Sequence, residues 1–183
     1  LIASIGMGIE EAAGEVTMDH FSRFQDDDCV FWGKFNSRGP ECLSLTAHCV
    51  DVAICFRTLS SLPGFRRSLE KSAERPLGNH ELDRLSVLAL FHDVGKANLG
   101  FQQKVFLSDS PKAGHVKELE PIFDDPSLLA DFKVALGFEV LRDWVETEEI
   151  LGSFFLASWS HHGRPLLFKG ERSGTYWLAK KEW

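Results

Sequence analysis

An aspartate directly follows a histidine near the middle of the chain, in the segment Phe91-His92-Asp93-Val94-Gly95-Lys96. An imidazole nitrogen beside carboxylate oxygens is a donor mixture that suits Mn, Fe, Co and Ni better than Mg. Lys96 adds a cation that could contact a phosphate or merely interact with a helix end. We interpret this segment as the hub of a metal site, with Asp93 and Lys96 as candidate catalytic residues.

Four further histidines complete a candidate ligand set: His48, His115 and the adjacent pair His161-His162. An aspartate can bridge two ions, and two ions roughly 3.5–4 Å apart can clamp the attacking and leaving oxygens of a phosphoryl transfer. Adjacent residues on a regular helix diverge by about 100°, so both members of the pair can bind only if a helix ends there, as Gly163 indicates. We therefore expect one or two divalent ions.

Each of these residues also has a structural interpretation. His92-Asp93 taken alone is typical of a helix C-terminus with a capping aspartate, and His48 could be a core histidine. His115 falls in an expected loop, where a histidine is unremarkable. Asp51 lies three residues after His48 on the same expected helix face, so we predict that it supports His48 rather than binding a metal.

Helical periodicity accounts for most of the chain. Ser44 is the expected N-cap of a helix that carries His48 and ends near Ser60. Asn79 is the expected cap of a second helix, which would place His92 on a buried face near its C-terminal end.

Beyond that helix we expect a short helix over about 99–107 and a loop over 111–126. A long helical pattern then runs from 126 to 144, and an apolar helix over 152–160 delivers His161-His162. Strand signal is weak, so the predicted fold class is all-α, a helical bundle in a single domain over 1–183 with the metal site between helices.

Composition limits the possible partners. A net charge of −7 argues against broad electrostatic capture of nucleic acid, but Arg164 and Lys169 in the basic tail could line the path of a strand. Phe168, Tyr176 and Trp177 could stack bases, whereas Trp159 is expected in the core. No apolar run approaches the roughly 20 residues that span a bilayer, so we expect a cytoplasmic chain without a membrane partner. Cys49 and Cys55 are expected to be small core residues.

Several local motifs together resemble one family. His48-Cys-Val-Asp51-Val-Ala, Phe91-His92-Asp93-Val-Gly-Lys96-Ala, the trailing Gly100-Phe-Gln102, the isolated His115 and His161-His162-Gly163 are similar to motifs of the HD superfamily of metal-dependent phosphohydrolases. Within it they most resemble the HD nuclease domain of the type I CRISPR-associated helicase–nuclease (Cas three). Trp32-Gly-Lys34 resembles the opening of that domain, and the similarity covers roughly residues 31–165.

The resemblance implies a division of the ligands between two metals. His48, His92 and Asp93 would hold one ion, and Asp93 would bridge to a second ion held by His115, His161 and His162. Lys96 would lie near the scissile phosphate. The activity implied is endo- or exonucleolytic cleavage of single-stranded DNA, with a helicase in the same or a companion chain and an RNA-guided CRISPR surveillance complex as partners.

The chain departs from the family pattern at one point. The family closes its first metal site with an aspartate well downstream of the paired histidines, but here Glu171 and Glu182 are the only carboxylates after His162. We therefore expect a weakly held or absent first metal, and a fragment of a longer helicase–nuclease that is truncated at its C-terminal end. Two alternatives stay open: an HD phosphohydrolase acting on a nucleotide or cyclic dinucleotide, and a non-catalytic HD module.

Overall fold

The computed structural model describes residues 31–35, 42–104, 113–163, 166 and 177. The predictions made for Arg164, Phe168, Lys169, Tyr176 and the two tail glutamates lie outside these residues.

Helices dominate the described chain, which confirms the predicted all-α class. The elements in order are β1 (Trp32–Phe35), β2 (Cys42–Ser44), α3 (Leu45–Leu59), α4 (Pro63–Ala73), α5 (Asn79–Leu90), η1 (Phe91–Ala97, a 3-10 helix), α6 (Leu99–Gln103), η2 (Lys117–Leu119, a 3-10 helix), α7 (Glu120–Asp124), α8 (Pro126–Ala135), α9 (Phe138–Arg142) and α10 (Glu148–Trp159).

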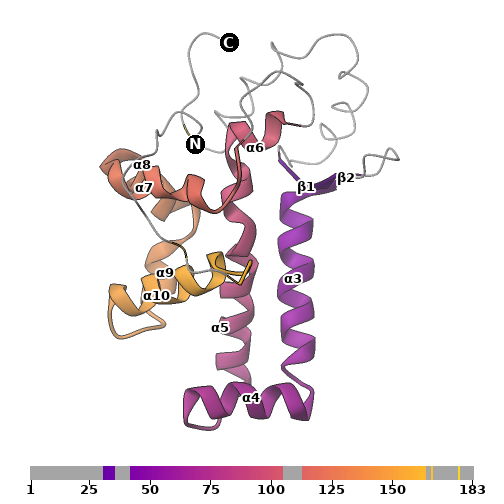
Figure 1. Ribbon diagram of the computed structural model, residues 1–183. Coiled ribbons are helices and arrows are strands. Elements are labelled where there is room, and N and C mark those ends of the chain that lie inside the picture. Colours follow the sequence, from indigo (N-terminus) through magenta and orange to yellow (C-terminus); the bar gives the residue numbers. More distant parts are fainter. Residues whose placement is uncertain (1–30, 36–41, 105–112, 164–165, 167–176, 178–183) are drawn as a thin grey trace.

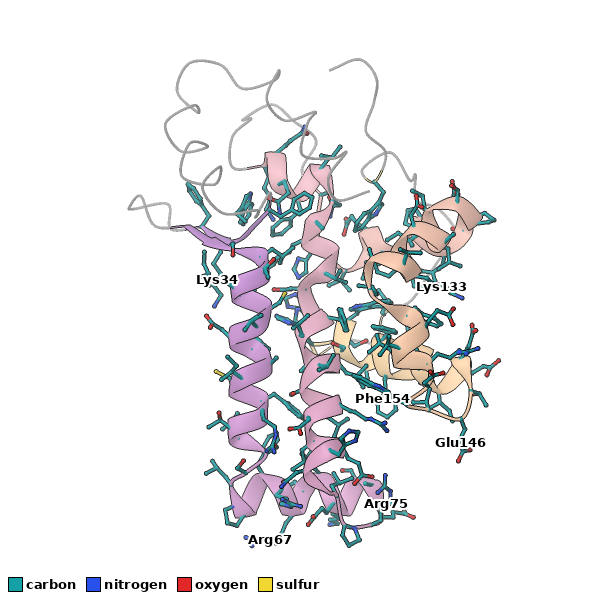
Figure 2. The ribbon with its side chains drawn as sticks, turned by 180° about the vertical axis from the view of Figure 1, so that it is seen from behind. Lys34, Arg67, Arg75, Lys133, Glu146 and Phe154 are labelled. Atoms are coloured by element: carbon teal, nitrogen blue, oxygen red, sulfur yellow. The ribbon has the colours of Figure 1, made fainter. Side chains whose placement is uncertain are left out.

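The two long helices α3 and α5 run side by side and form the axis of the molecule (Figure 1). Helix α4 crosses one end of this pair, and the antiparallel hairpin of β1 and β2 lies at the other end. Helices α7 to α10 pack beside α5, on the side away from α3. Figure 2 shows the same two ends of the molecule from behind: Lys34 lies at the hairpin end, and Arg67 and Arg75 lie at the α4 end. None of the described helices combines the length and the apolar character that crossing a membrane requires.

Helix α3 begins and ends where its sequence predicts. The Ser44 hydroxyl accepts a hydrogen bond from the Ala47 amide at 3.1 Å, which satisfies one of the free N–H groups of the first turn. Ser60 caps the other end, and its amide donates to the Phe56 carbonyl. Cys49 is buried as expected, but Cys55 is exposed, as is Ile54 beside it, so the predicted core position of Cys55 is wrong.

Helix α5 differs from its prediction at both ends. Gly78, and not Asn79, is the N-cap; its amide donates to Glu81 Oε2 at 2.6 Å, and Asn79 is the first helical residue. The α-helix ends at Leu90, and the chain then tightens into η1, which carries His92 and Asp93. A 3-10 segment is a common continuation of an α-helix C-terminus, and its side chains are spaced differently from those of the expected α-helix.

Two further stretches are divided differently from the prediction. The expected loop over 111–126 contains η2 and α7. The expected long helix over 126–144 is broken at Gly137, which adopts φ 63°, a left-handed conformation that favours glycine and separates α8 from α9.

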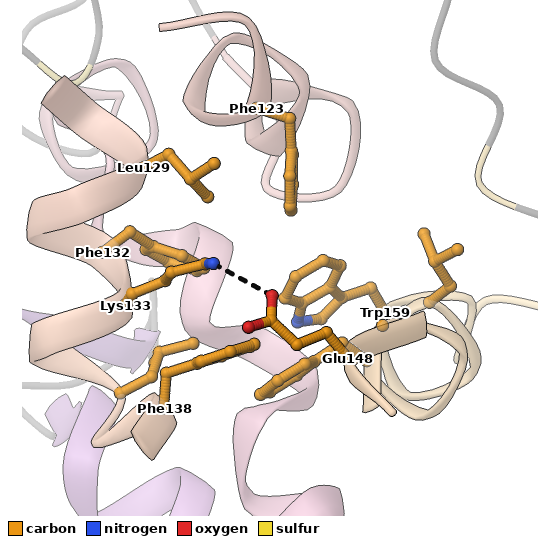
Figure 3. A pocket seen from close by; sticks show the side chains of 11 residues that line it. Phe123, Leu129, Phe132, Lys133, Phe138, Glu148 and Trp159 are labelled. Carbon is orange, nitrogen blue, oxygen red and sulfur yellow. Dashed lines mark hydrogen bonds and ion pairs between the residues drawn. The ribbon is translucent and has the colours of Figure 1, made fainter. Parts of the chain in front are cut away.

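The main core lies between α5, α7, α8, α9 and α10, and its buried members are Leu88, Leu119, Ile122, Leu128, Phe132, Leu141, Leu151, Phe155, Trp159 and Trp177. Trp159 is therefore a core residue, as predicted. Trp177 is only 4% exposed and its indole N–H donates to the Glu118 carbonyl, so it has no free face for base stacking. Beside this core a cavity of about 290 Å³ is lined by aromatic side chains, with the ion pair of Lys133 and Glu148 at its edge (Figure 3).

A glutamine joins the hairpin to the segment that carries Asp93. Gln102 is 3% exposed, and its side chain accepts from the Trp32 amide and donates to the Trp32 carbonyl, both at 3.0 Å. It also donates to the Lys96 carbonyl at 2.7 Å, and the Trp32 indole donates back to the Gln102 carbonyl. One buried side-chain amide therefore links β1 to the C-terminal end of η1.

Replacing Gln102 by alanine should destabilise the fold by about 2–4 kcal/mol, because the buried backbone groups of Trp32 and the Lys96 carbonyl lose their partner. The measurement is the free energy of unfolding in urea. Gln103→Ala is the matched control, since Gln103 is next in α6 and only partly buried. Equal losses in the two variants would contradict a specific role for Gln102.

Candidate metal centre

Five histidines and Asp93 converge from four segments of the chain. His48 comes from the first turns of α3, and His92 and Asp93 come from η1. His115 lies in the loop before η2, and His161 and His162 follow Ser160, the residue that caps the C-terminus of α10. All six residues predicted as metal ligands therefore meet at one place between the helices.

His48, His92 and Asp93 form a group that we call the first triad. Asp93 Oδ2 lies 2.8 Å from His48 Nε2 and 3.2 Å from His92 Nε2, and the candidate donor atoms all lie within 4.8 Å of one another. His48 is 6% exposed and Asp93 is 3% exposed. The first triad is thus largely buried between α3 and η1.

His115, His161 and His162 form a second triad, whose candidate donor atoms also lie within 4.8 Å of one another. His115 Nε2 is 3.0 Å from His162 Nε2. The other carboxylate oxygen, Asp93 Oδ1, is 3.2 Å from His115 Nε2 and 3.4 Å from His161 Nε2. His161 and His162 are exposed, so the second triad faces solvent while the first does not.

One carboxylate oxygen of this centre, Asp93 Oδ1, has no hydrogen-bond donor in good geometry among the described residues. Asp93 Oδ1 is buried and makes no well-oriented hydrogen bond within the described chain, although two imidazole nitrogens face it. A buried carboxylate oxygen in that condition is costly unless a cation satisfies it. Three imidazoles and one carboxylate oxygen are also a suitable donor set for a divalent transition metal. The residues present therefore fit a bound metal.

Backbone carbonyls orient two of the rings. His92 Nδ1 lies 3.0 Å from the Ala89 carbonyl, and His161 Nδ1 lies 3.2 Å from the Ser158 carbonyl. With Nδ1–H donating to a carbonyl, Nε2 is the nitrogen left to bind a metal ion in place of any proton that it shares with Asp93. In both residues Nε2 is the atom that faces Asp93.

The local electrostatics favour the metal-binding protonation states. Burial raises the pKa of Asp93, but the donor groups of His115, His92 and Lys96 lower it by more, so this pKa lies far below its ordinary value. Burial of the His48 ring, and partial burial of the His161 ring, whose side chain is 26% exposed, lower the pKa of both residues below the ordinary value; the nearby Asp93 offsets this only in part. At neutral pH the carboxylate is therefore ionised and these two imidazoles are neutral.

Lys96 is placed as the counter-ion of Asp93. Its ammonium lies 2.5 Å from Asp93 Oδ2 and donates to the Gly33 carbonyl at 3.0 Å, and its side chain is 12% exposed. Its predicted contact with a scissile phosphate stays a prediction.

Two other residues near the first triad take no part in it. Asp51 is exposed on α3 and makes no hydrogen bond or ion pair with any described residue, so the expected support of His48 has no contact behind it. Burial raises the pKa of the Cys49 thiol to about 11, so this thiol is protonated at neutral pH, and it belongs to neither group of candidate metal donors.

Two glycines near the metal centre, Gly33 and Gly95, have packing roles that the sequence motifs did not predict. A Cβ at Gly95 would lie 1.7 Å from the His115 carbonyl oxygen, so glycine is required for the His115 loop to approach η1. A Cβ at Gly33 would lie 2.8 Å from His48 Cβ, so β1 could not pack on the start of α3. The sequence marks both residues as parts of motifs, but the contacts are between distant segments.

Comparison with known proteins gives one match. The family model described as "Cas3, HD domain" matches residues 32–183, which is most of the chain. Searches of the curated proteins and of the solved structures found no significant match.

Asp93→Asn should reduce the affinity for divalent metals by at least about 100-fold, because both triads lose the ionised carboxylate that they share. The measurement is metal content and affinity after stripping with a chelator and titration with Mn²⁺ or Co²⁺. Asp131→Asn, an exposed aspartate on α8, is the matched control and should bind as the wild type does. Unchanged binding in Asp93→Asn would contradict the bridging role.

Gly95→Ala should lower the free energy of unfolding by at least about 2 kcal/mol, because the new methyl group overlaps the backbone of the His115 loop. Gly152→Ala is the control: a Cβ there meets nothing within 4 Å on α10, so stability should rise by about 0.5–1 kcal/mol. Chemical denaturation of both variants tests this, and a neutral effect at Gly95 would show that the loop can move away at little cost.

Proposed function

Because the chain belongs to the family of Cas3 HD domains, a family of HD-type hydrolases, we propose that it is a metal-dependent nuclease that hydrolyses phosphodiester bonds of single-stranded DNA in type I CRISPR interference. The observation that carries this proposal is the position of Asp93, whose two oxygens face two separate histidine groups. Such a shared carboxylate is the expected support for two neighbouring ions.

The donor chemistry supports the proposal. Five imidazoles and one carboxylate favour Mn, Fe, Co or Ni over Mg. When bound, such ions polarise a phosphoryl oxygen and make water a nucleophile near neutral pH.

The residues of the chain divide the remaining tasks between them. Asp93 keeps its charge and holds the two triads at a fixed separation, since it is buried and contacted from both sides. The exposed second triad offers the approach for a phosphodiester, because the first triad is enclosed. Lys96 fixes one carboxylate oxygen and lies close enough to help neutralise a phosphate that reaches the centre.

The wider setting is part of the same proposal. A helicase, in the same or a companion chain, would supply the single strand, and an RNA-guided surveillance complex would select the target. We place this activity in the cytoplasm. The contacts proposed for Arg164 and Lys169 with the DNA backbone belong here as well.

The full chain should cut circular single-stranded DNA when supplied with Mn²⁺, Co²⁺, Ni²⁺ or Fe²⁺, and a chelator should stop the cutting. Asp93→Ala should lower the rate by at least about 1,000-fold, whereas Asp131→Ala should not change it. A gel assay with circular and end-labelled linear strands separates endonuclease from exonuclease action.

Other results of this assay favour the alternatives. Turnover of nucleotides or cyclic dinucleotides with intact DNA would replace the proposal by a small-molecule phosphohydrolase. Absence of both metal binding and turnover would leave a non-catalytic HD module.

A further inference from the structure

A fully buried asparagine lies between the segment that carries Asp93 and the segment that carries His115. Asn98 is 0% exposed and stands between η1 and α6. Its side-chain oxygen accepts from the Phe101 amide at 2.8 Å and so caps α6. Within the described chain, the Asn98 side chain makes no hydrogen bond with the side chain of a candidate metal ligand.

The other end of the same amide joins two segments. Asn98 Nδ2 donates to the Gly95 carbonyl at 2.7 Å and to the Gly114 carbonyl at 2.9 Å. Gly95 lies two residues after Asp93, and Gly114 directly precedes His115. Since only the NH₂ group can donate to two carbonyls, the orientation of the amide is fixed by chemistry. One side chain therefore ties the segment of Asp93 to the segment of His115.

The fit at this point is close. The His115 carbonyl approaches Gly95 so nearly that a Cβ there would overlap it. The Ala113 amide also joins the His115 loop to α6, where it donates to the Gly100 carbonyl at 3.3 Å; this hydrogen bond is longer than the 2.9 Å bond from Asn98 to Gly114. Asn98 thus sets how far the His115 loop lies from η1, and with it the 3.2 Å between His115 Nε2 and Asp93 Oδ1.

The other ligands are held by different means. His48 is fixed by α3, and the His92 ring by the Ala89 carbonyl. His161 and His162 follow α10, which is anchored where Ser158 donates to the Leu88 carbonyl and Trp159 donates to the Phe91 carbonyl. Loss of the Asn98 bridge should therefore affect His115 selectively.

We infer that Asn98 is a positioning residue that holds His115 against Asp93 and thereby sets the metal affinity of the second triad, while leaving the first triad unaffected. This role rests on the two-triad centre of the proposed function. It makes no demand on the substrate, so it can be tested by metal binding alone.

Asn98→Asp is the sharpest variant, because it keeps the shape and the capping oxygen but replaces the donor of two hydrogen bonds with an acceptor that faces two carbonyls. Asn98→Ser is the second variant; it is neutral and also keeps a capping oxygen, so it serves if the buried charge prevents folding. Leu82→Ala, a fully buried change in α5, is the control for general loss of stability.

Each change is made in the full chain carrying either His48→Ala or His162→Ala, so that one triad is read at a time. Chelator-stripped protein is titrated with Co²⁺ and followed by its visible absorption, and melting is recorded in parallel. In the His48→Ala background, Asn98→Asp or Asn98→Ser should weaken Co²⁺ binding about 10–100-fold. In the His162→Ala background, the same changes should alter the affinity by less than about twofold.

A selective loss that Leu82→Ala does not reproduce at an equal drop in melting temperature supports the inference. Equal losses in both backgrounds, or no loss in either, overturn it. The variants could show this selective loss while the wild-type chain binds Co²⁺ but does not cut DNA. That result would contradict the proposed nuclease function and would still support the role of Asn98.

Discussion

The ionised carboxylate of Asp93 is the interaction on which the rest of the structure depends. It is buried, and burial alone would favour the neutral acid. Nitrogen groups from α3, η1, the His115 loop and the end of α10 surround it and reverse that preference. The fold thus brings these four distant segments of the chain together around one buried charge.

Local patterns predicted much of this frame. Ser44 marks the start of α3, and a hydroxyl that caps its own helix is a local interaction. The apolar run before His161 predicted a central helix, and α10 does bury Leu151, Phe155 and Trp159. The motifs, through their resemblance to the HD family, likewise predicted which side chains would meet.

Contacts between distant segments could not be predicted in the same way. Gly95 is required because the His115 backbone passes close to it, and Gly33 because α3 does. Asn98 carries a visible signal for a helix cap, but its second role depends on a carbonyl 16 residues away. The shift of the α5 cap from Asn79 to Gly78 has a simpler cause: the Gly78 amide donates to the Glu81 carboxylate, which is the N3-to-N-cap half of a capping box and fixes the helix start at Gly78.

The 3-10 geometry of η1 has a consequence for the central charge. With three residues per turn, side chains at i and i+3 are eclipsed, and this is the spacing of Asp93 and Lys96. In an α-helix the same two positions would be rotated apart by about 60°. The geometry of this ion pair therefore depends on the winding of the backbone as well as on the two residue types. A change that rewound this turn would rotate the ammonium relative to the carboxylate without altering either side chain.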